Sequence, residues 1–375
     1  MTTSAETPFA LVDRAKVERN VARLRDHLGG LGVALRPHVK TTKALEPTSM
    51  AFGGGTGPIT VSTLAEAEFF AGAGYTDILY AVGIAPGKLD RVARLRQRGV
   101  DLTILLDTVT QAEAVVAFAT EHDVPLPALI EIDSDGHRGG VRADDPQLLE
   151  IAGVLAEGGV EVRGVMTHAG ESYFAYTPEA LRAAAEGERR AIVDAATRLR
   201  DGGHPAPVVS VGSTPTAHAA TDLSGVTEVR AGNYVFFDLV MAGIGVCTVE
   251  DIALSVAATV IGRGPDESLL TDAGWTATSS DRGTSVQPVD QHLGIVTTDE
   301  GVVIEDLVMV GASQEHGVLA VRPGAGRGLP DLAVGTRVRI LPIHACATAA
   351  QHDHYEVMLG EGEPVTERWE RAHGW

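Results

Sequence analysis

The chain has 375 residues, of which 44% are hydrophobic, so it is long enough to bury a large core and to form two domains. Its 30 basic residues stand against 50 acidic ones, and the net charge of −20 argues against a track for nucleic-acid phosphates. No apolar run approaches the ~20 residues of a membrane span, and the N-terminus lacks the pattern of a signal peptide. The two cysteines give no disulfide framework. Together these features predict a cytoplasmic protein without a membrane or nucleic-acid partner.

Residues 9–243 alternate between short β-branched runs and amphipathic helical stretches, the pattern of repeated βα units around a parallel sheet. Helices are expected over 64–73, 88–98, 110–122 and 178–201. Eight strands within about 250 residues fit an α/β fold of the (β/α)8 TIM-barrel type better than an open doubly wound sheet. The predicted strands are 33–36, 58–62, 77–82, 101–107, 127–133, 161–168, 207–212 and 228–236.

From residue 244 onward the helical periodicity fades, and short strand-like runs recur between Gly, Pro and Asp turns. This pattern predicts a second, mostly antiparallel β domain over 244–375, with residues 1–8 as an extended arm that joins it. Its predicted strands are 254–262, 268–271, 294–298, 302–305, 308–311, 317–321, 337–341 and 355–358.

Lys40, which follows the first predicted strand, is conspicuous because lysine is rare in this chain. The sequence holds four lysines against 26 arginines. Arginine stays protonated, whereas the surroundings of a lysine amine can deprotonate it so that it attacks a carbonyl carbon. Lys40 is therefore a candidate for amine chemistry, and the alternative is an ordinary lysine in a surface loop.

Other polar residues follow the later strands, where a barrel gathers its catalytic groups. Arg138 comes after the fifth strand, His168 and Tyr173 come after the sixth, and Tyr234 lies in the eighth. Each has a plainer alternative. His168 can be a core histidine bonded to a backbone carbonyl, and the tyrosines can be packing residues.

The stretch Gly212-Ser213-Thr214-Pro215-Thr216 follows the seventh strand, a position where barrels often bind phosphate. Glycine allows close approach of the backbone, and three hydroxyl groups are available as donors. The same residues also suit an ordinary turn with a helix cap, so both interpretations stand at this point.

His344 and Cys346 are two residues apart near the C-terminus. If this stretch is a strand, both side chains point to one face and can bind one metal ion with open positions left over. A thiolate ligand favours zinc over magnesium. A lone His-x-Cys is also common by chance, so the pair is a metal candidate only in combination with other signals.

Together these motifs resemble the D-serine dehydratase and D-threonine aldolase family, whose barrel is of the fold-type III pyridoxal-phosphate kind seen in alanine racemase. The resemblance spans nearly the whole chain. One departure is Thr42, where the family commonly has His after Lys-Thr. The resemblance is carried by the run from Arg36 to Thr41, by 135–140, 168–173, 212–216, 232–234, 272–274, 280–283 and 314–317, and by His344-x-Cys346.

The resemblance implies that pyridoxal 5'-phosphate binds in the barrel. Lys40 would bind its aldehyde, Arg138 would lie near the ring oxygen, and Gly212, Ser213 and Thr214 would bind its phosphate. His168, Tyr173 and Tyr234 would line the site. His344 and Cys346 would bind an activating divalent metal, with zinc expected and manganese or magnesium as alternatives, and the family also implies a homodimer. Lys40, Tyr173, His344 and Cys346 are the residues expected to act in the reaction.

The substrate class implied by the resemblance is a β-hydroxy-D-amino acid, such as D-serine. The leading hypothesis is a dehydratase that yields a keto acid and ammonia. The alternative is an aldolase that cleaves the substrate to glycine and an aldehyde. Aldolases of this family tend to pair His with Asp, so Cys346 favours dehydration. An amino-acid racemase and a non-catalytic cofactor-binding protein are weaker hypotheses, since neither explains both the metal pair and the large second domain.

Overall fold

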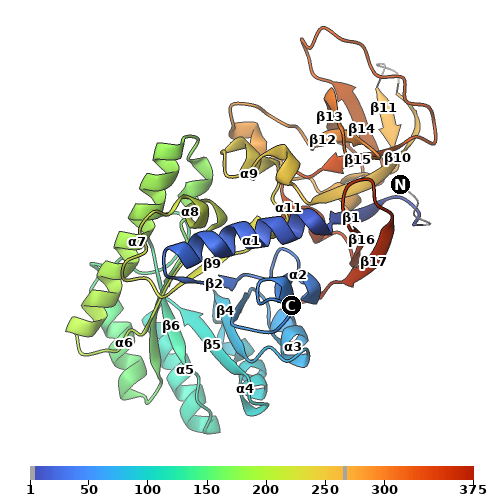
Figure 1. The fold of residues 1–375 in the computed structure, drawn as a ribbon. Helices are drawn as coiled ribbons and strands as arrows, with labels where there is room; N and C mark the ends of the chain where they lie inside the picture. The colour runs from blue at the N-terminus through green and yellow to red at the C-terminus, as the bar shows by residue number, and fades with distance from the viewer. Residues whose placement is uncertain (1–4, 265–267) are drawn as a thin grey trace. The chain divides into compact units, whose positions relative to one another are not determined.

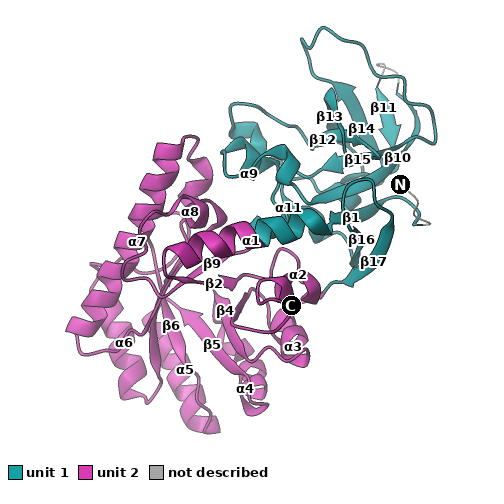
Figure 2. Cartoon of the chain, in the orientation of Figure 1, with its two compact units in different colours: residues 1–21, 233–371 teal, residues 22–232, 372–375 magenta. Residues whose placement is uncertain are grey.

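A computed structural model of the chain describes residues 5–264 and 268–375. The chain divides into two compact units (Figure 2). Unit 1 consists of residues 1–21 and 233–371, and unit 2 consists of residues 22–232 and 372–375. The sequence placed the main boundary at residue 243. Within the described residues, no helix combines the length and apolarity needed to cross a membrane.

Unit 2 is a nearly closed barrel of eight parallel strands, with helices around the outside (Figure 1). Neighbouring strands follow the order β2-β9-β8-β7-β6-β5-β4-β3. A single bridge between His38 and Thr60 joins the two ends of this order, and the Val39 amide donates to the Thr60 carbonyl at 2.9 Å. The strands are β2 (Ala34–Pro37), β3 (Ile59–Val61), β4 (Asp77–Gly83), β5 (Asp101–Leu106), β6 (Ala128–Ile132), β7 (Val162–Thr167), β8 (Val208–Val211) and β9 (Glu228–Ala231).

Most barrel strands are rich in apolar residues, as expected for parallel strands that are covered on both faces, although β2, β7 and β9 each contain an arginine. Leu79, Leu105, Leu129 and Met166, from four neighbouring strands, form one buried apolar cluster. The helices of this unit are α2 (Leu45–Met50), α3 (Leu64–Gly72), α4 (Leu89–Gln97), α5 (Val109–His122), α6 (Gln147–Glu157), α7 (Pro178–Asp201) and α8 (Thr214–Ala219). The predicted α/β fold is therefore confirmed as far as a nearly closed sheet of eight parallel strands.

Unit 1 is built on a nine-stranded sheet in the order β11-β14-β13-β12-β15-β10-β1-β16-β17. The N-terminal strand β1 (Phe9–Asp13) pairs antiparallel with β10 and parallel with β16, so residues 9–13 belong to this sheet. Residues 1–4 of the predicted arm lie outside the described residues. A buried cluster of β-branched and aliphatic residues that includes Val256, Leu307 and Val338 forms the core. The remaining strands are β10 (Leu254–Arg263), β11 (Leu269–Thr271), β12 (Ile295–Thr298), β13 (Val303–Ala312), β14 (Gly317–Val321), β15 (Arg337–Leu341), β16 (His354–Met358) and β17 (Val365–Glu370).

Three strand predictions were wrong in detail. The runs 302–305 and 308–311 form one strand, β13, and at the expected break the pairing of this strand with β12 is irregular between Val303 and Val308. The predicted strand 228–236 ends at Ala231, because the Asn233 side chain donates to Asp238 at 2.6 Å within a tight turn. The strand β17 was missed because its sequence is mostly polar.

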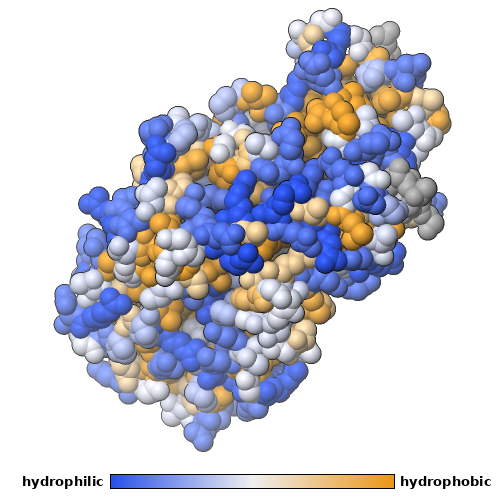
Figure 3. Space-filling model, in the orientation of Figure 1, coloured by the Kyte–Doolittle hydropathy of each residue, from blue (hydrophilic) through white to orange (hydrophobic). Residues whose placement is uncertain are grey.

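Helix α1 (Arg14–Gly30) follows β1, and the short helices α9 (Leu239–Gly243), α10 (Trp275–Thr278) and α11 (Ala345–Ala349) lie in unit 1. The face drawn in Figure 3 is mostly hydrophilic with dispersed apolar residues. This agrees with the excess of acidic side chains in the sequence.

Candidate active site

Lys40 lies in the turn that follows β2, at the C-terminal end of the barrel strand. The turn is held by the Lys43 amide, which donates to the Val39 carbonyl at 2.7 Å. Lys40 is partly buried, while Thr41 and Thr42 beside it are buried. The expected place of Lys40 at the end of the first barrel strand is therefore observed.

Two histidines, His38 and His168, lie close enough to Lys40 to feel its charge. Burial, followed by the positive charge of Lys40, lowers the pKa of His168 to about 3. The same two causes lower the pKa of His38 well below its usual 6.5. Both rings are therefore neutral at pH 7, and Lys40 has no imidazolium beside it.

His168 combines the two interpretations that the sequence left open. Its Nδ1 lies 2.8 Å from the Gly212 carbonyl oxygen, so Nδ1 carries the proton and Nε2 is an acceptor. This is the backbone contact of a structural histidine, yet the same ring lies within the field of Lys40. The ring of Tyr173 lies 6.3 Å from that of His168, centroid to centroid, so these two predicted residues are brought together.

The stretch after β8 is a helix cap. Ser213 is the N-cap of α8, and its hydroxyl lies 2.9 Å from the hydroxyls of both Thr216 and Ser172. Gly212 has φ +148°, and a Cβ there would lie 1.8 Å from the Arg230 carbonyl oxygen, so only glycine fits. The cap uses the Ser213 hydroxyl, and Thr214 opens the helix from a buried position.

Glu188 on α7 is a buried carboxylate that the sequence analysis missed. Its Oε1 accepts hydrogen bonds from the Ala169 amide at 3.1 Å and from the Gly212 amide at 3.0 Å. It thus ties the segment after β7 to the segment after β8. Burial raises the pKa of Glu188 above its usual value, against the effect of these donors. A glutamate on the apolar face of a long amphipathic helix was the available signal.

Glu188→Ala is expected to lower the free energy of unfolding by about 2 kcal/mol or more, because two amides lose their acceptor in a buried place. Thermal denaturation followed by circular dichroism measures this loss. Glu186→Ala is the matched control, since Glu186 is an exposed partner of Arg189 on the same helix and should cost less than about 1 kcal/mol. Equal stability of the two variants would contradict the role of Glu188.

Arg230 on β9 is a second missed residue. It is buried, and its guanidinium donates to the Ser210 hydroxyl at 2.6 Å and to the Thr167 carbonyl at 2.5 Å. Burial, opposed by nearby carboxylates such as Glu228 and Glu188, lowers its pKa to about 10, so it stays charged. Its strand is the short run Glu-Val-Arg-Ala, which gave no clear signal in the sequence.

Arg138 lies in the loop that follows β6 and is exposed. Its guanidinium is 3.4 Å from Glu131, and the loop is held by the Asp107 carboxylate, which accepts from the Gly140 amide at 2.9 Å. The charge of Arg138 contributes to the low pKa of His168. Arg138 therefore shares the electrostatic environment of Lys40 and His168 while remaining accessible to solvent.

Tyr234 belongs to unit 1 and is fully buried. Its hydroxyl has no hydrogen-bond partner among the described residues, and burial raises its pKa well above 10. A buried hydroxyl group without a hydrogen-bond partner is uncommon in the core of a folded protein.

His344 and Cys346 also lie in unit 1, but not on a strand, so the expected geometry was wrong. His344 is the N-cap of α11, and Cys346 lies in its first turn. The two side chains still interact, because the turn of the helix brings them together. Asp281 was missed: its Oδ2 lies 2.8 Å from Nδ1 of His344.

The surroundings of His344 favour the positively charged form of its imidazole ring. Burial acts to lower its pKa, but the hydrogen bond to Asp281 and the contact with Cys346 outweigh it and raise the pKa to about 11. With Nδ1 held by Asp281, Nε2 is the nitrogen available to a metal, in the usual carboxylate–histidine–metal arrangement. No group of three His, Cys, Asp or Glu that could hold a metal ion occurs among the described residues.

Comparison with known proteins gives matches over nearly the whole chain. Residues 12–240 match the family of the alanine racemase N-terminal domain, and residues 253–358 match the putative serine dehydratase domain. D-threo-3-hydroxyaspartate dehydratase of Delftia sp. strain HT23 is 52% identical over 99% of this chain and 98% of its own. D-serine dehydratase of Dictyostelium discoideum is 31% identical over 96% of this chain and 95% of its own.

The solved structure of the Delftia enzyme superposes with a TM-score of 0.95 at 51% identity, over 99% of both chains. D-threonine aldolase from Filomicrobium marinum has a TM-score of 0.81 at 24% identity, over 98% of this chain and 95% of its own, which is a likeness of fold.

Proposed function

This chain belongs to the family that joins an alanine racemase-type N-terminal domain to a serine dehydratase domain, and on that premise we propose that it is a dehydratase of β-hydroxy-D-amino acids dependent on pyridoxal phosphate and a divalent metal. The single observation that supports dehydration best is the 52% identity to a D-threo-3-hydroxyaspartate dehydratase over nearly the full length. That compound is accordingly the first substrate to test, followed by D-serine.

The metal proposal rests on the chemistry of the pair in unit 1. Variants of the Delftia enzyme include a histidine-to-alanine and a cysteine-to-alanine replacement two positions apart, the latter solved in a metal-free form. His344 and Cys346 have the same spacing. An imidazole nitrogen and a thiolate, with Asp281 fixing the imidazole, suit zinc, and manganese or magnesium are the alternatives.

The cofactor proposal rests on the environment of Lys40. The Nδ1 of His38 is buried without a hydrogen-bond partner among the described residues, and both nearby histidines are neutral. Lys40 and Arg138 supply the positive charge that a phosphorylated aldehyde requires. Because the Ser213 hydroxyl is used by the helix cap, the phosphate would be held chiefly by Thr214 and by backbone amides after Gly212. His168, Tyr173 and Tyr234 would line the site.

Bound pyridoxal phosphate supplies a conjugated ring that accepts the negative charge developing at the substrate Cα. The Nζ of Lys40 would hold the cofactor and would accept the proton from Cα. Because the His168 ring is neutral, it does not protonate the Lys40 amine, and that amine stays available as the base. His344 and Cys346 would hold the ion that polarises the β-hydroxyl for departure, and Asp281 keeps the Nε2 of His344 free to bind it.

Cleavage by an aldolase is the second candidate. Relatives named D-threonine aldolase and 3-hydroxy-D-aspartate aldolase match at 27% and 26% identity over 97% and 93% of this chain. Cys346 supports dehydration instead, since the aldolases resembled by this chain tend to pair His with Asp. The alanine racemase structures match at only 12–13% identity and so support the fold alone.

We also propose that the chain forms a homodimer. Light scattering on the protein as it elutes from a size-exclusion column would test this.

A product assay separates the two reactions. The enzyme, loaded with pyridoxal phosphate and zinc, is incubated with D-threo-3-hydroxyaspartate, D-serine and D-threonine. Dehydration is expected to release ammonia and a keto acid in equal amounts, with the hydroxyaspartate reacting fastest. Glycine with an aldehyde and no keto acid would reject the dehydratase in favour of the aldolase.

A further inference from the structure

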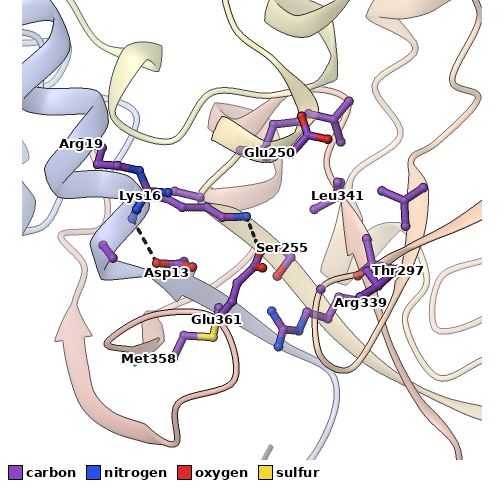
Figure 4. Close-up of a pocket in the computed structure, with 17 residues that line it drawn as sticks. Asp13, Lys16, Arg19, Glu250, Ser255, Thr297, Arg339, Leu341, Met358 and Glu361 are labelled. Atoms are coloured by element: carbon purple, nitrogen blue, oxygen red, sulfur yellow. Dashed lines mark hydrogen bonds and ion pairs between the residues drawn. The ribbon is translucent and has the colours of Figure 1, made fainter.

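Unit 1 contains a cavity of about 540 Å³ that none of the residues assigned above lines (Figure 4). This volume is in the usual range for small-molecule sites. Its floor is one face of five neighbouring strands, β12, β15, β10, β1 and β16, which contribute Thr297, Arg339, Ser255, Asp13 and Met358. The start of α1, the turn at Val249–Asp251 and the residues between β12 and β13 surround it.

The floor is polar where the sheet would be expected to bury apolar side chains. Asp13 and Arg339 are each 3% exposed, and Ser255 and Thr297 are buried as well. Asp13 has a structural explanation, because its Oδ1 accepts from the Lys16 amide at 3.0 Å at the start of α1. Arg339 has no comparable explanation.

Arg339 is a buried cation whose donors are only partly satisfied. Its Nη2 donates to the Asp299 carbonyl oxygen, while its Nε has no hydrogen-bond partner among the described residues. The carboxylates of Asp299, Glu361, Asp13 and Glu300 act on it through their charge. Burial lowers its pKa in spite of these carboxylates. A buried charge that is incompletely paired is costly, so an anion beside the guanidinium would relieve that cost.

A second cation borders the same space. The Nζ of Lys16 lies 2.6 Å from Oε1 of Glu361, and the Glu361 side chain is 46% exposed. In Figure 4 the Lys16 amine and the Arg339 guanidinium approach Glu361 from opposite sides. A ligand carboxylate can therefore replace Glu361 at Lys16 without leaving a buried acid unpaired.

The rest of the lining is mostly apolar, and Arg19 and Glu250 add one charge of each sign at its edge. Val249, Ile252, Val302, Val303 and Leu341 line the cavity together with Met358. Inorganic phosphate would leave these surfaces unused, whereas the carbon skeleton of an organic acid would cover them. A planar guanidinium also matches a carboxylate in geometry.

We propose that this cavity is a binding site for a small organic acid anion, whose carboxylate lies beside Arg339 and Lys16 and whose carbon skeleton packs on the apolar wall. The site is independent of the proposed reaction, because none of Lys40, His344 and Cys346 takes part in it.

Isothermal titration calorimetry of the holoenzyme with 3-phenylpropionate tests the proposal. This probe has a carboxylate and an apolar body but no amine to react with the cofactor. One molecule should bind per chain with an unchanged cofactor absorbance spectrum, and Lys40→Ala should bind it equally well. Arg339→Met should weaken binding at least about tenfold, and Lys16→Met should weaken it less.

Arg263→Met is the matched control, since Arg263 is an exposed arginine of unit 1 outside the cavity, and it should bind as the unaltered enzyme does. If Arg339→Met does not fold, Lys16→Met, which removes only the amine at the start of α1, still decides the question. No binding to the unaltered enzyme, equal affinity in Lys16→Met, or binding of inorganic phosphate as tight as that of 3-phenylpropionate would each overturn the proposal.

Discussion

Lys40→Ala is expected to abolish turnover of every β-hydroxy-D-amino acid, by a factor of about 10³ or more, while the chain stays folded. The variant loses both the covalent anchor of the cofactor and the base at the substrate Cα, and such groups acting as a unit cost far more than ordinary contacts. Lys40 is only partly buried and lies in a turn, so its removal leaves no large cavity. The visible absorbance of the bound cofactor should disappear together with the activity.

Lys88→Ala serves as the control for Lys40. The Nζ of Lys88 donates to the Tyr80 hydroxyl at 2.9 Å, and nothing places it near the histidines that surround Lys40. Its variant should keep both the absorbance and the rate. If Lys40→Ala retained the visible band and released ammonia at an unchanged rate, Lys40 would be an ordinary surface lysine.

Cys346→Ala is expected to remove the metal, because the proposed ligand pair of His344 and Cys346 loses one of its two members. Zinc affinity should fall by about 10² or more, and keto acid production should fall with it. Asp281→Asn should have a smaller effect of about 10–100-fold, since the His344 ring loses its orienting carboxylate but keeps its nitrogen.

This prediction is tested by the zinc content per chain after dialysis, measured together with the rate of keto acid production. Cys247→Ala is the matched control, because Cys247 is a buried thiol outside the pair and should bind no zinc. Full zinc content in Cys346→Ala, or a full rate without zinc, would show that the pair has no part in the reaction.

The barrel could be predicted because most of its strands are short apolar runs bounded by turns. The run at 77–82 reads Asp-Ile-Leu-Tyr-Ala-Val, and the observed strand is Asp77–Gly83. The prediction failed where the place of a strand is set by its pairing with a neighbouring strand and not by an apolar run in the sequence. The strand β17 buries Trp369, but four of its six residues are polar, and its place is set by pairing with β16.

The site was predictable only where a residue type is chemically distinctive by itself. Lys40 stood out through composition, and His344-x-Cys346 stood out through its ligand types. Asp281 could not be found in this way, since its role depends on His344, which lies 63 residues further along the chain. Glu188 and Arg230 depend in the same way on backbone groups that only the folded barrel brings to them.

We propose above all that this chain eliminates the β-hydroxyl of a D-amino acid with the help of a metal at His344 and Cys346. The most direct measurement is the yield of oxaloacetate, ammonia, glycine and glyoxylate from D-threo-3-hydroxyaspartate, before and after chelation and after zinc is restored. We expect equal amounts of oxaloacetate and ammonia that vanish on chelation and return with zinc. Glycine and glyoxylate as the main products, or an oxaloacetate yield untouched by chelation, would contradict it.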